Sequence, residues 1–457
     1  MKNILGIDLG TSSVKMIYDD GKKIHKVKEK YDSISTSGWL SAIKKCTARL
    51  DLTSIRAVAL SSQVGTYIVD GGEVISWNDP EGKEELDEIL SAISREEFIR
   101  EISMPHPKII SYPLPRLLYI KRHYPEAKKV CQPKDLLCEA LTGYYATDKF
   151  SYRGLANLEN GKYSEKLLKK FSLDSLSLPA VHSPTDIVGR ITESGSEISG
   201  IPCGTPVIVG CNDFFAGLLG MGIISEGDAF DITGTSEHLG LLTAALPEKD
   251  DSLVCGSYFN HNAHYGVTQS SGKSLDFGME IHDFKSLDIE KCLQNDPPIF
   301  LPYINGERAP IWDAKARGVF FGICEGCDKE ILAYSTLEGV CFSIYHVFET
   351  MGKPNITSLT VSGGASKDAL MNKMKASLFS CPVYIPEETD SSAFGAMMLA
   401  SVGLGDYDSV AEAIEQNCKK NLAALPDESL GNRLRERFEI YKSIYPALKD
   451  KFSLLQK

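Results

Sequence analysis

The hydrophobic and polar positions of the chain repeat one pattern at two places that lie more than two hundred residues apart. The stretch "GIDLGTSSVK", Gly6–Lys15, is an apolar run that carries an Asp, followed by a Gly-Thr-Ser turn and a second β-type run. The stretch "FDITGTSEHLG", Phe230–Gly240, has the same order. Short apolar runs bounded by turn residues predict strands that are joined in a hairpin. The pattern therefore predicts the same hairpin twice.

Between and after the two hairpins, short apolar runs alternate with stretches of helical spacing. In the first half the predicted elements are a helix at about Trp39–Leu50, mostly helical sequence over Glu84–Leu141, and strands at Ile55–Ser62, Gly72–Asp79 and Thr205–Asp213. In the second half they are helices over Ile331–Thr350, Lys367–Phe379 and Ser392–Val402, and a strand over Ser358–Gly364. This alternation predicts an α/β fold with helices on the faces of mixed sheets. We expect two related domains, residues 1–222 and 223–457, that meet near residues 219–228.

The composition of the 457 residues, 43% hydrophobic and 24% charged, is ordinary for a globular protein. The formal net charge of −12 argues against a general nucleic-acid binder, because binding to phosphates calls for basic surface. The longest apolar run, Ala393–Gly405, is shorter than the ~18 residues of a membrane span, and Asp8 interrupts the N-terminal apolar stretch. We expect neither nucleic acid nor membrane as a partner.

The twelve cysteines are scattered singly, except for Cys324 and Cys327. A lone C-x-x-C without a second pair is weak evidence for a metal. His261 and His264 have no acidic or Cys neighbour in the sequence, which favours solvated loop histidines. We interpret the cysteines as reduced thiols, and we expect a cytoplasmic protein. The sequence leaves open whether the chain forms a homodimer.

A Gly-Thr-Ser turn offers backbone N–H groups and two hydroxyls to a phosphate without adding negative charge. The candidate residues are Gly10, Thr11 and Ser12 in the first hairpin and Gly234, Thr235 and Ser236 in the second. Lys15 would neutralise a phosphate, and Asp8 at a strand end would hold Mg²⁺ through water. One such turn alone is also a common tight turn. Two copies in matching positions favour a pair of turns that hold one triphosphate.

Two glycine-rich stretches resemble nucleotide-binding motifs but do not have the spacing that those motifs require. In "GVTQSSGKS", Gly266–Ser274, five residues intervene where a P-loop requires four, and no clear strand–loop–helix unit is predicted there. "GLLGMG", Gly217–Gly222, lacks the dinucleotide spacing. The candidate nucleoside residues follow a buried strand and lead into a helix: Gly363, Gly364, Ala365 and Lys367. Such a crevice lets a flat ring lie on backbone, and the alternative is a plain strand-to-helix turn.

Asp213 is the candidate general base, because it ends a buried strand beside the apolar Phe214 and Phe215, where desolvation would raise its pKa. The alternative is a helix N-cap, and one residue can have both roles. The candidate acceptor-binding residues combine amides and carboxylates with an indole, which suits a polyhydroxylated ligand. They are Gln63, Trp77, Asn78, Asp79, Asn212 and Asp213 itself.

These residues resemble, in order and over essentially the whole chain, the motifs of the FGGY carbohydrate kinases in their xylulokinase-like form. The matching stretches are "GIDLGTSSVK", "WND", "PKDLLCEALTG", "ATD", "CND", "FDITGTSEHLG", "GERAPIWDAKARGVFFG", "SGGASKDALMN" and "SSAFGAMMLA". The resemblance implies two actin-like (ribonuclease H-like) domains with a nucleotide cleft between them, and phosphorylation of a sugar hydroxyl with ATP and Mg²⁺. It also implies Asp213 as the base, Asp8 near Mg²⁺, the two turns on phosphates, and Gly363–Ala365 on the nucleoside.

The chain departs from the family pattern mainly where the acceptor would bind. Val64-Gly65-Thr66 stands where xylulokinases usually have Met-His after the "GQ", and Pro80 stands directly after Asp79 where an arginine often follows. Further departures are Met371, Lys373 and Ser377 in the adenosine helix and Asp390 before "AFGA". We expect a ketose such as xylulose, with a polyol, a sugar acid or a signalling molecule of similar size as alternatives.

Two other classes of function compete with a kinase. A non-catalytic sugar or nucleotide sensor on the same scaffold predicts the loss of Asp8 or Asp213, and both are present. An actin-like or chaperone-like ATPase should lack a polyol pocket and the "GERAP" segment, and this chain has candidates for both. The sequence therefore favours a kinase.

Overall fold

The computed structural model describes residues 1–269 and 271–455, which fall into two compact units. Unit 1 comprises Met1–Ile224, Gly256–Asn260 and Asp390–Cys418, and unit 2 comprises Ser225–Cys255, His261–Thr389 and Lys419–Lys457. The chain thus returns to unit 1 twice after it has entered unit 2. The assignment of functions to residues 1–222 and 223–457 stays a prediction.

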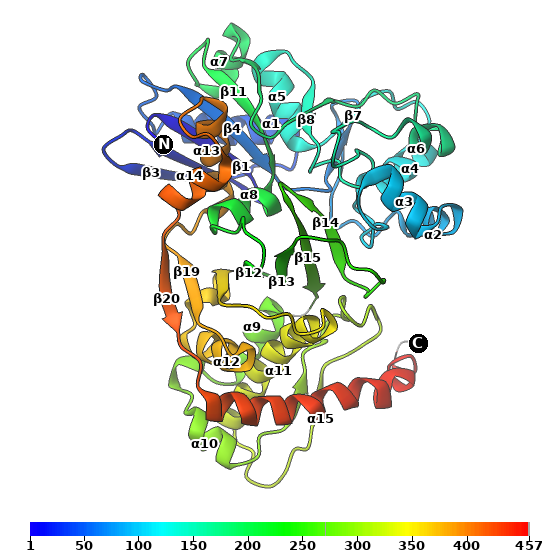
Figure 1. The fold of residues 1–457 in the computed structure, drawn as a ribbon, viewed down its shortest axis with the longest axis vertical. Helices are drawn as coiled ribbons and strands as arrows, with labels where there is room; N and C mark the ends of the chain where they lie inside the picture. Colours follow the sequence, from blue (N-terminus) through cyan, green and yellow to red (C-terminus); the bar gives the residue numbers. More distant parts are fainter. Residues whose placement is uncertain (270, 456–457) are drawn as a thin grey trace. The chain divides into compact units, whose positions relative to one another are not determined.

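Unit 1 is built on a six-stranded sheet in the order β10-β11-β4-β1-β2-β3. Figure 1 labels four of its strands, β1, β3, β4 and β11. Its strands are β1 Ile4–Leu9, β2 Ser13–Asp19, β3 Ile24–Lys30, β4 Ala57–Ser62, β10 Ile187–Arg190 and β11 Pro206–Asn212. Strands β1 and β2 are antiparallel and form the first predicted hairpin, whereas β1, β4 and β11 run parallel to one another. Every residue of β1 and β4 is buried, which fits parallel strands that are covered on both faces.

Six strands of the second sheet lie wholly in unit 2, in the order β15-β13-β12-β18-β19-β20. They are β12 Ala229–Thr233, β13 Glu237–Thr243, β15 His261–Thr268, β18 Leu359–Gly363, β19 Val383–Pro386 and β20 Lys420–Ala424. Strands β12 and β13 form the second hairpin, and β12 runs parallel to β18 and β18 to β19. The pairing matches that of the first sheet strand by strand, so the duplication predicted from the two hairpins is confirmed.

Small residues let two helices of unit 1 pack closely, namely α8 (Asp213–Gly220) and α13 (Ser391–Gly403). A Cβ at Gly395 would lie 1.9 Å from a backbone oxygen of α8, and a Cβ at Gly6 of β1 would lie 2.0 Å from a backbone oxygen of α13. Real side chains never approach backbone so closely, so these positions need glycine. Helix α13 is thereby held against the strand that carries Asp8.

The remaining elements of unit 1 surround the sheet and extend beyond it. The helices are α1 Thr36–Thr47, α2 Lys83–Ala92, α3 Arg95–Ile102, α4 Pro113–His123, α5 Pro133–Thr142, α6 Glu165–Lys170, α7 Glu193–Ser199 and α14 Val410–Asn417. The short strands are β5 Tyr67–Val69, β6 Glu73–Ile75, β7 Val130–Cys131, β8 Ala146–Asp148 and β9 Ala180–His182. Helix α1 begins where the Ser35 side chain accepts a hydrogen bond from the Gly38 N–H, a normal N-cap.

Helix α11, Lys329–Thr350, is the central helix of unit 2. By length and composition it could cross a membrane. However, 89% of its apolar 18-residue stretch is buried inside the protein, as in a core helix. The other helical segments are α9 Gly272–Ile281, η1 Phe284–Ser286, α10 Ile289–Gln294, η2 Gly364–Lys367, α12 Ala369–Phe379 and α15 Glu428–Phe452. The remaining strands are β14 Val254–Tyr258, β16 Ile299–Leu301 and β17 Val319–Phe321.

The histidines are placed differently from the prediction. His261 and His264 lie on β15 and not in a solvated loop, and His264 is buried with its Nε2 2.7 Å from Asp251 Oδ2. The predicted lack of an acidic partner was wrong, because strand pairing brings in a carboxylate from an earlier loop. Among the described residues no group of three His, Cys, Asp or Glu side chains is arranged to hold a metal.

Candidate active site

Asp8 and Asp213 lie at the same edge of the first sheet, where the parallel strands end. Asp8 of β1 and Cys211 of β11 both pair with Ser61 of β4, and Asp213 follows two residues after Cys211. Neighbouring strands are ~4.8 Å apart, so the strands of the two carboxylates are roughly 10 Å apart. The carboxyl edge of parallel strands is where α/β folds place their ligands.

Asp213 is the first residue of α8, but it does not cap the helix. The N-cap is Asn212, whose side-chain oxygen accepts a hydrogen bond from the Phe215 N–H at 3.0 Å. Asp213 Oδ1 instead accepts a hydrogen bond from the Phe214 N–H at 2.8 Å. Burial raises the pKa of Asp213 to about 7, and the negative charge of Asp8 adds to this rise. A carboxyl with such a pKa exchanges its proton near neutral pH.

Asp8 is almost completely buried, and the Ser61 hydroxyl donates to its Oδ1 at 3.3 Å. Burial raises the pKa of Asp8 to about 6, while the charge of Lys15 opposes the rise. A divalent cation would offset the cost of burying this carboxylate. Mg²⁺ typically uses one or two carboxylates and keeps several waters, so Asp8 fits such a ligand.

The first Gly-Thr-Ser turn contacts the loop that carries Trp77. Trp77 Nε1 donates a hydrogen bond to Thr11 Oγ1 at 3.2 Å, and Gly10 N–H donates to the Ser13 oxygen at 3.1 Å. Thr11, a candidate phosphate-binding residue, and Trp77, a candidate acceptor-binding residue, are therefore in contact within unit 1. Lys15 Nζ lies 3.1 Å from Asp390 Oδ1, so its charge is shared with a carboxylate.

Two buried amides at strand ends beside Asp213 have polar atoms without a partner. Gln63 directly follows β4, Asn212 ends β11, and both side chains are buried. Within the part of the chain that the structure describes, Gln63 Oε1 and Asn212 Nδ2 make no hydrogen bond. Leaving a buried polar atom unpaired costs ~1–3 kcal/mol, so these atoms point to a polar ligand.

Asn78 and Asp79 lie in a turn after β6 that is held by its own hydrogen bonds. The Ser76 hydroxyl donates to Asn78 Oδ1 at 2.6 Å, and the Ser76 N–H donates to Asp79 Oδ2 at 2.7 Å. The fully buried Arg116 of α4 donates to the Asp79 backbone oxygen at 3.1 Å. Arg116 was not predicted, because nothing in the sequence of α4 indicates which loop it contacts.

The second Gly-Thr-Ser turn joins β12 to β13 and contacts the start of α9. Gly272 N–H donates to the Gly234 oxygen at 3.1 Å, and a Cβ at Gly272 would lie 2.6 Å from that oxygen. The prediction that no strand–loop–helix unit surrounds Gly266–Ser274 was wrong, since β15 and α9 form one; its Ser270 lies outside the described residues. The segment reaches the phosphate turn without having the P-loop spacing.

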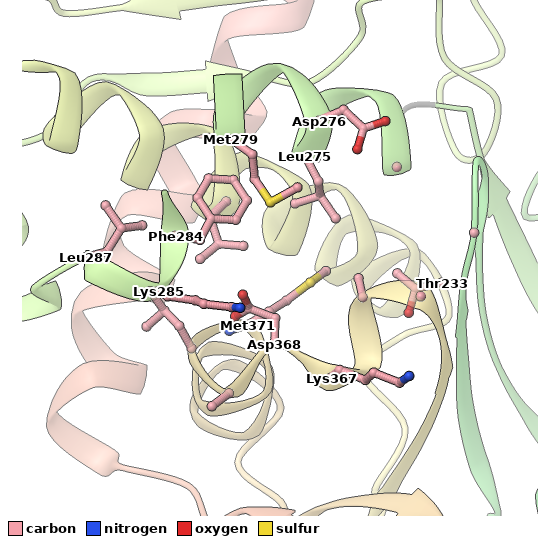
Figure 2. Close-up of a pocket in the computed structure, with 17 residues that line it drawn as sticks. Thr233, Leu275, Asp276, Met279, Phe284, Lys285, Leu287, Lys367, Asp368 and Met371 are labelled. Atoms are coloured by element: carbon pink, nitrogen blue, oxygen red, sulfur yellow. Dashed lines mark hydrogen bonds between the residues drawn. The ribbon is translucent and has the colours of Figure 1, made fainter. Parts of the chain in front are cut away.

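Unit 2 contains a cavity of about 680 Å³ that reaches the second turn at Gly234. Figure 2 shows Leu275, Met279 and Phe284 on one side and Lys367, Asp368 and Met371 on the other. Its volume and mostly apolar lining are typical of a small-molecule site.

Three of the four predicted nucleoside residues, Gly364, Ala365 and Lys367, line this cavity. Gly363 ends β18 with φ +93°, where a Cβ would lie 1.9 Å from the Thr233 oxygen. The lining residues of α9 and η1 were not predicted, because the sequence pattern did not indicate a helix there. They are Gly272, Leu275, Asp276, Met279, Phe284 and Lys285.

Comparison with known proteins finds two family domains, one after the other along the chain. Residues 3–220 match the N-terminal domain and residues 229–404 the C-terminal domain of the FGGY family of carbohydrate kinases. The chain is 27% identical to a xylulose kinase of Lactococcus lactis subsp. lactis, over 97% of both chains. It is 25% identical to a gluconokinase of Bacillus subtilis, over 98% of this chain and 97% of that one.

The fold is likewise that of solved relatives. The crystal structure of a ligand-bound xylulose kinase from Lactobacillus acidophilus superposes with a TM-score of 0.87 at 24% identity, over 100% of both chains. The two domain models together cover most of the residues, and the relatives align over nearly their full lengths. The chain belongs to the FGGY family of carbohydrate kinases, with the two-domain fold of the actin-like ATPases.

Proposed function

We propose that this carbohydrate kinase transfers the γ-phosphoryl group of ATP to a hydroxyl of a small sugar or sugar derivative, with Asp213 as the general base. The observation that carries the proposal is the Asp213 carboxyl itself. It is half-buried at the carboxyl edge of the first sheet, with a pKa raised to about 7. The unpaired amide atoms of Gln63 and Asn212 lie at the ends of adjacent strands.

In this mechanism Asp213 accepts the proton of the acceptor hydroxyl as that oxygen attacks the phosphorus. Phosphoryl transfer depends mostly on positioning and charge neutralisation, and a base with a pKa near the working pH is the most effective. The N–H groups and hydroxyls of the two Gly-Thr-Ser turns would hold phosphate oxygens. Mg²⁺ would neutralise charge on the phosphates when bound, and Asp8 is the residue that would hold it, through water.

For the acceptor we propose a ketose such as xylulose, with a polyol or a sugar acid as alternatives. The Trp77 indole supplies an apolar face, and the amides of Gln63 and Asn212 supply directed hydrogen bonds, a combination that suits a polyhydroxylated chain. The names of the relatives, xylulose kinase and gluconokinase, support a ketose and a sugar acid respectively.

The test measures ADP release by the purified protein with Mg-ATP against D-xylulose, L-xylulose, D-ribulose, L-ribulose, gluconate, glycerol and erythritol. We expect one compound to stimulate ADP release at least about tenfold over the reaction without acceptor, since the base acts only on a bound hydroxyl. Omission of Mg²⁺ serves as the control. If no compound stimulates ADP release while ATP still binds, the result would contradict this acceptor class and favour a sensor.

A further inference from the structure

Three ionisable side chains are buried together next to the second Gly-Thr-Ser turn. Lys375 of α12 is 1% exposed, and its Nζ lies 2.5 Å from Asp231 Oδ2 and 2.7 Å from Glu237 Oε1. Both carboxylates are fully buried. We call Asp231, Glu237 and Lys375 the buried triad. None of the three is needed for the mechanism described above.

The buried triad joins the elements that form the turn and the cavity. Asp231 lies on β12, and Glu237 is the first residue of β13, directly after the turn. Lys375 lies on α12, whose first residues, Ala369, Leu370 and Met371, line the cavity together with its N-cap Asp368. One ammonium group thus contacts both strands that flank the turn and belongs to the helix that forms a wall of the cavity.

Stability alone does not account for such a cluster. Burying an ion costs several kcal/mol, and a neutral set of the same shape is often as stable or more so. A buried ionic cluster does restrict geometry, because movement of one partner leaves another charge buried and unpaired. Among the described residues Asp231 Oδ1 has no hydrogen-bond partner, so Asp231 depends on Lys375 through its other oxygen.

We propose that Lys375 is a positioning residue for the nucleotide: through Asp231 and Glu237 it fixes the second Gly-Thr-Ser turn relative to the cavity, so that one ATP molecule contacts both. The inference rests on the proposed function, because it treats the turn and the cavity as parts of one nucleotide site. The triad sets the distance between the phosphate contacts and the nucleoside contacts.

The test uses a neutral variant, Asp231→Asn/Glu237→Gln/Lys375→Met, which preserves shape and buries no charge. Its Kd for ADP, measured by isothermal titration calorimetry on the full chain, should rise about tenfold, the scale of residues that act through others. The KM for ATP should rise by the same factor, and the KM for the acceptor should stay within about twofold. A folded neutral variant that binds ADP as tightly as the wild type overturns the inference.

The matched control removes another ion pair of unit 2, with a buried carboxylate, that does not line the cavity. Arg437 Nε donates to Glu338 Oε1 at 2.7 Å, between α15 and α11. Glu338→Gln/Arg437→Met should change the free energy of unfolding and leave the Kd for ADP unchanged. An equal rise of the Kd in this control would show general loosening of unit 2 and would overturn the inference.

Thr235→Val separates this inference from the proposed function. If Thr235→Val leaves the KM for ATP unchanged, the turn does not hold phosphate and the proposed role of the turn fails. If Thr235→Val raises the KM for ATP while the neutral variant does not, the role of the turn stands and only the positioning inference fails.

A pH series tests whether the charge of the triad matters beyond its packing. Burial raises the pKa of Glu237 to about 8, and the charge of Asp231 adds to the rise while Lys375 opposes it. Ser271 at the start of α9 and Cys341 of α11 also face the triad. Deprotonation of Glu237 completes the ionic cluster with Lys375, so wild-type affinity for ADP should rise between pH 7 and 9. Glu237→Gln should abolish this rise, and an identical profile in the variant overturns the inference.

Discussion

At the scale of a single residue, the proton affinity of Asp213 results from opposing effects. The N-terminus of α8 favours the carboxylate by ~0.3–1 kcal/mol. Burial acts the other way, the charge of Asp8 adds to it, and the net effect raises the pKa from 3.8 to about 7, on the order of 4 kcal/mol. Burial therefore wins, and it produces a base that is poised near neutral pH. Asn212 satisfies the helix end, so the Asp213 carboxyl is not required as its cap.

Asp213→Asn should lower kcat for the acceptor by about 100-fold or more, the usual contribution of a general base. The amide keeps the size and the helix position of the carboxyl, so the Kd for ADP should not change. ADP release and calorimetry measure the two quantities. Near-normal turnover in the variant would remove Asp213 from the role of base.

The pH dependence of the wild type follows from the same pKa. The base must be deprotonated, so kcat/KM for the acceptor should rise about tenfold for each pH unit below 7 and level off above it. The proton on Asp8, with a pKa of about 6, should steepen the fall at lower pH. A pH–rate profile checks this, and a rate that is level from pH 5 to 8 would exclude both assignments.

At the scale of elements, the contact between α8 and α13 determines how firmly the base is held. Gly395→Ala would place a Cβ 1.9 Å from the Ala216 oxygen, which forces the helices apart. We expect a loss of about 1–3 kcal/mol in the free energy of unfolding, the usual cost of overpacking. Urea denaturation measures it. Gly72→Ala is the control, because a Cβ there has no neighbour within 4 Å and should leave the unfolding midpoint in place.

The second Gly-Thr-Ser turn gives a prediction about nucleotide use. Thr235→Val removes a hydroxyl while it preserves the branched shape, so the KM for ATP should rise about tenfold, the loss of one hydrogen bond to a charged group. The KM for the acceptor should change little. Steady-state kinetics with each substrate varied in turn measure both KM values. A change in the KM for the acceptor alone would exclude the turn as a phosphate site.

Local patterns were sufficient for those parts of the site that lie at strand ends. The two hairpins and the strand before Asp213 were predicted because an apolar run and its turn residues are neighbours in sequence. Helix α9 was not predicted because "SSGKSLDF" has no clear apolar stripe, so its lining residue Asp276 was not predicted either. The lining residues Phe284 and Lys285 of η1 were also not predicted. Lys375 and Arg116 were missed for another reason: a charged helical residue suggests solvent, and only tertiary contacts show that both are buried.

At the scale of the whole molecule, nucleotide binding should stabilise the folded chain by mass action. At an ADP concentration of about 100 times its Kd, the gain in unfolding free energy should be about 2.7 kcal/mol. Thermal unfolding with and without ADP measures the gain, and Asp213→Asn should show the same gain because the base does not hold the nucleotide. No shift at saturating ADP would contradict a nucleotide site in the folded protein.

The return of residues 390–418 to unit 1 has a consequence for biosynthesis. Strand β1 leaves the ribosome long before α13, the helix packed against its Gly6. At 5–20 residues per second, the wait from residue 224 to residue 418 is about 10–40 s. During that interval the nascent chain exposes an apolar face of its first sheet. We therefore expect residues 1–224 to need protection, for example by a chaperone, until α13 has been made.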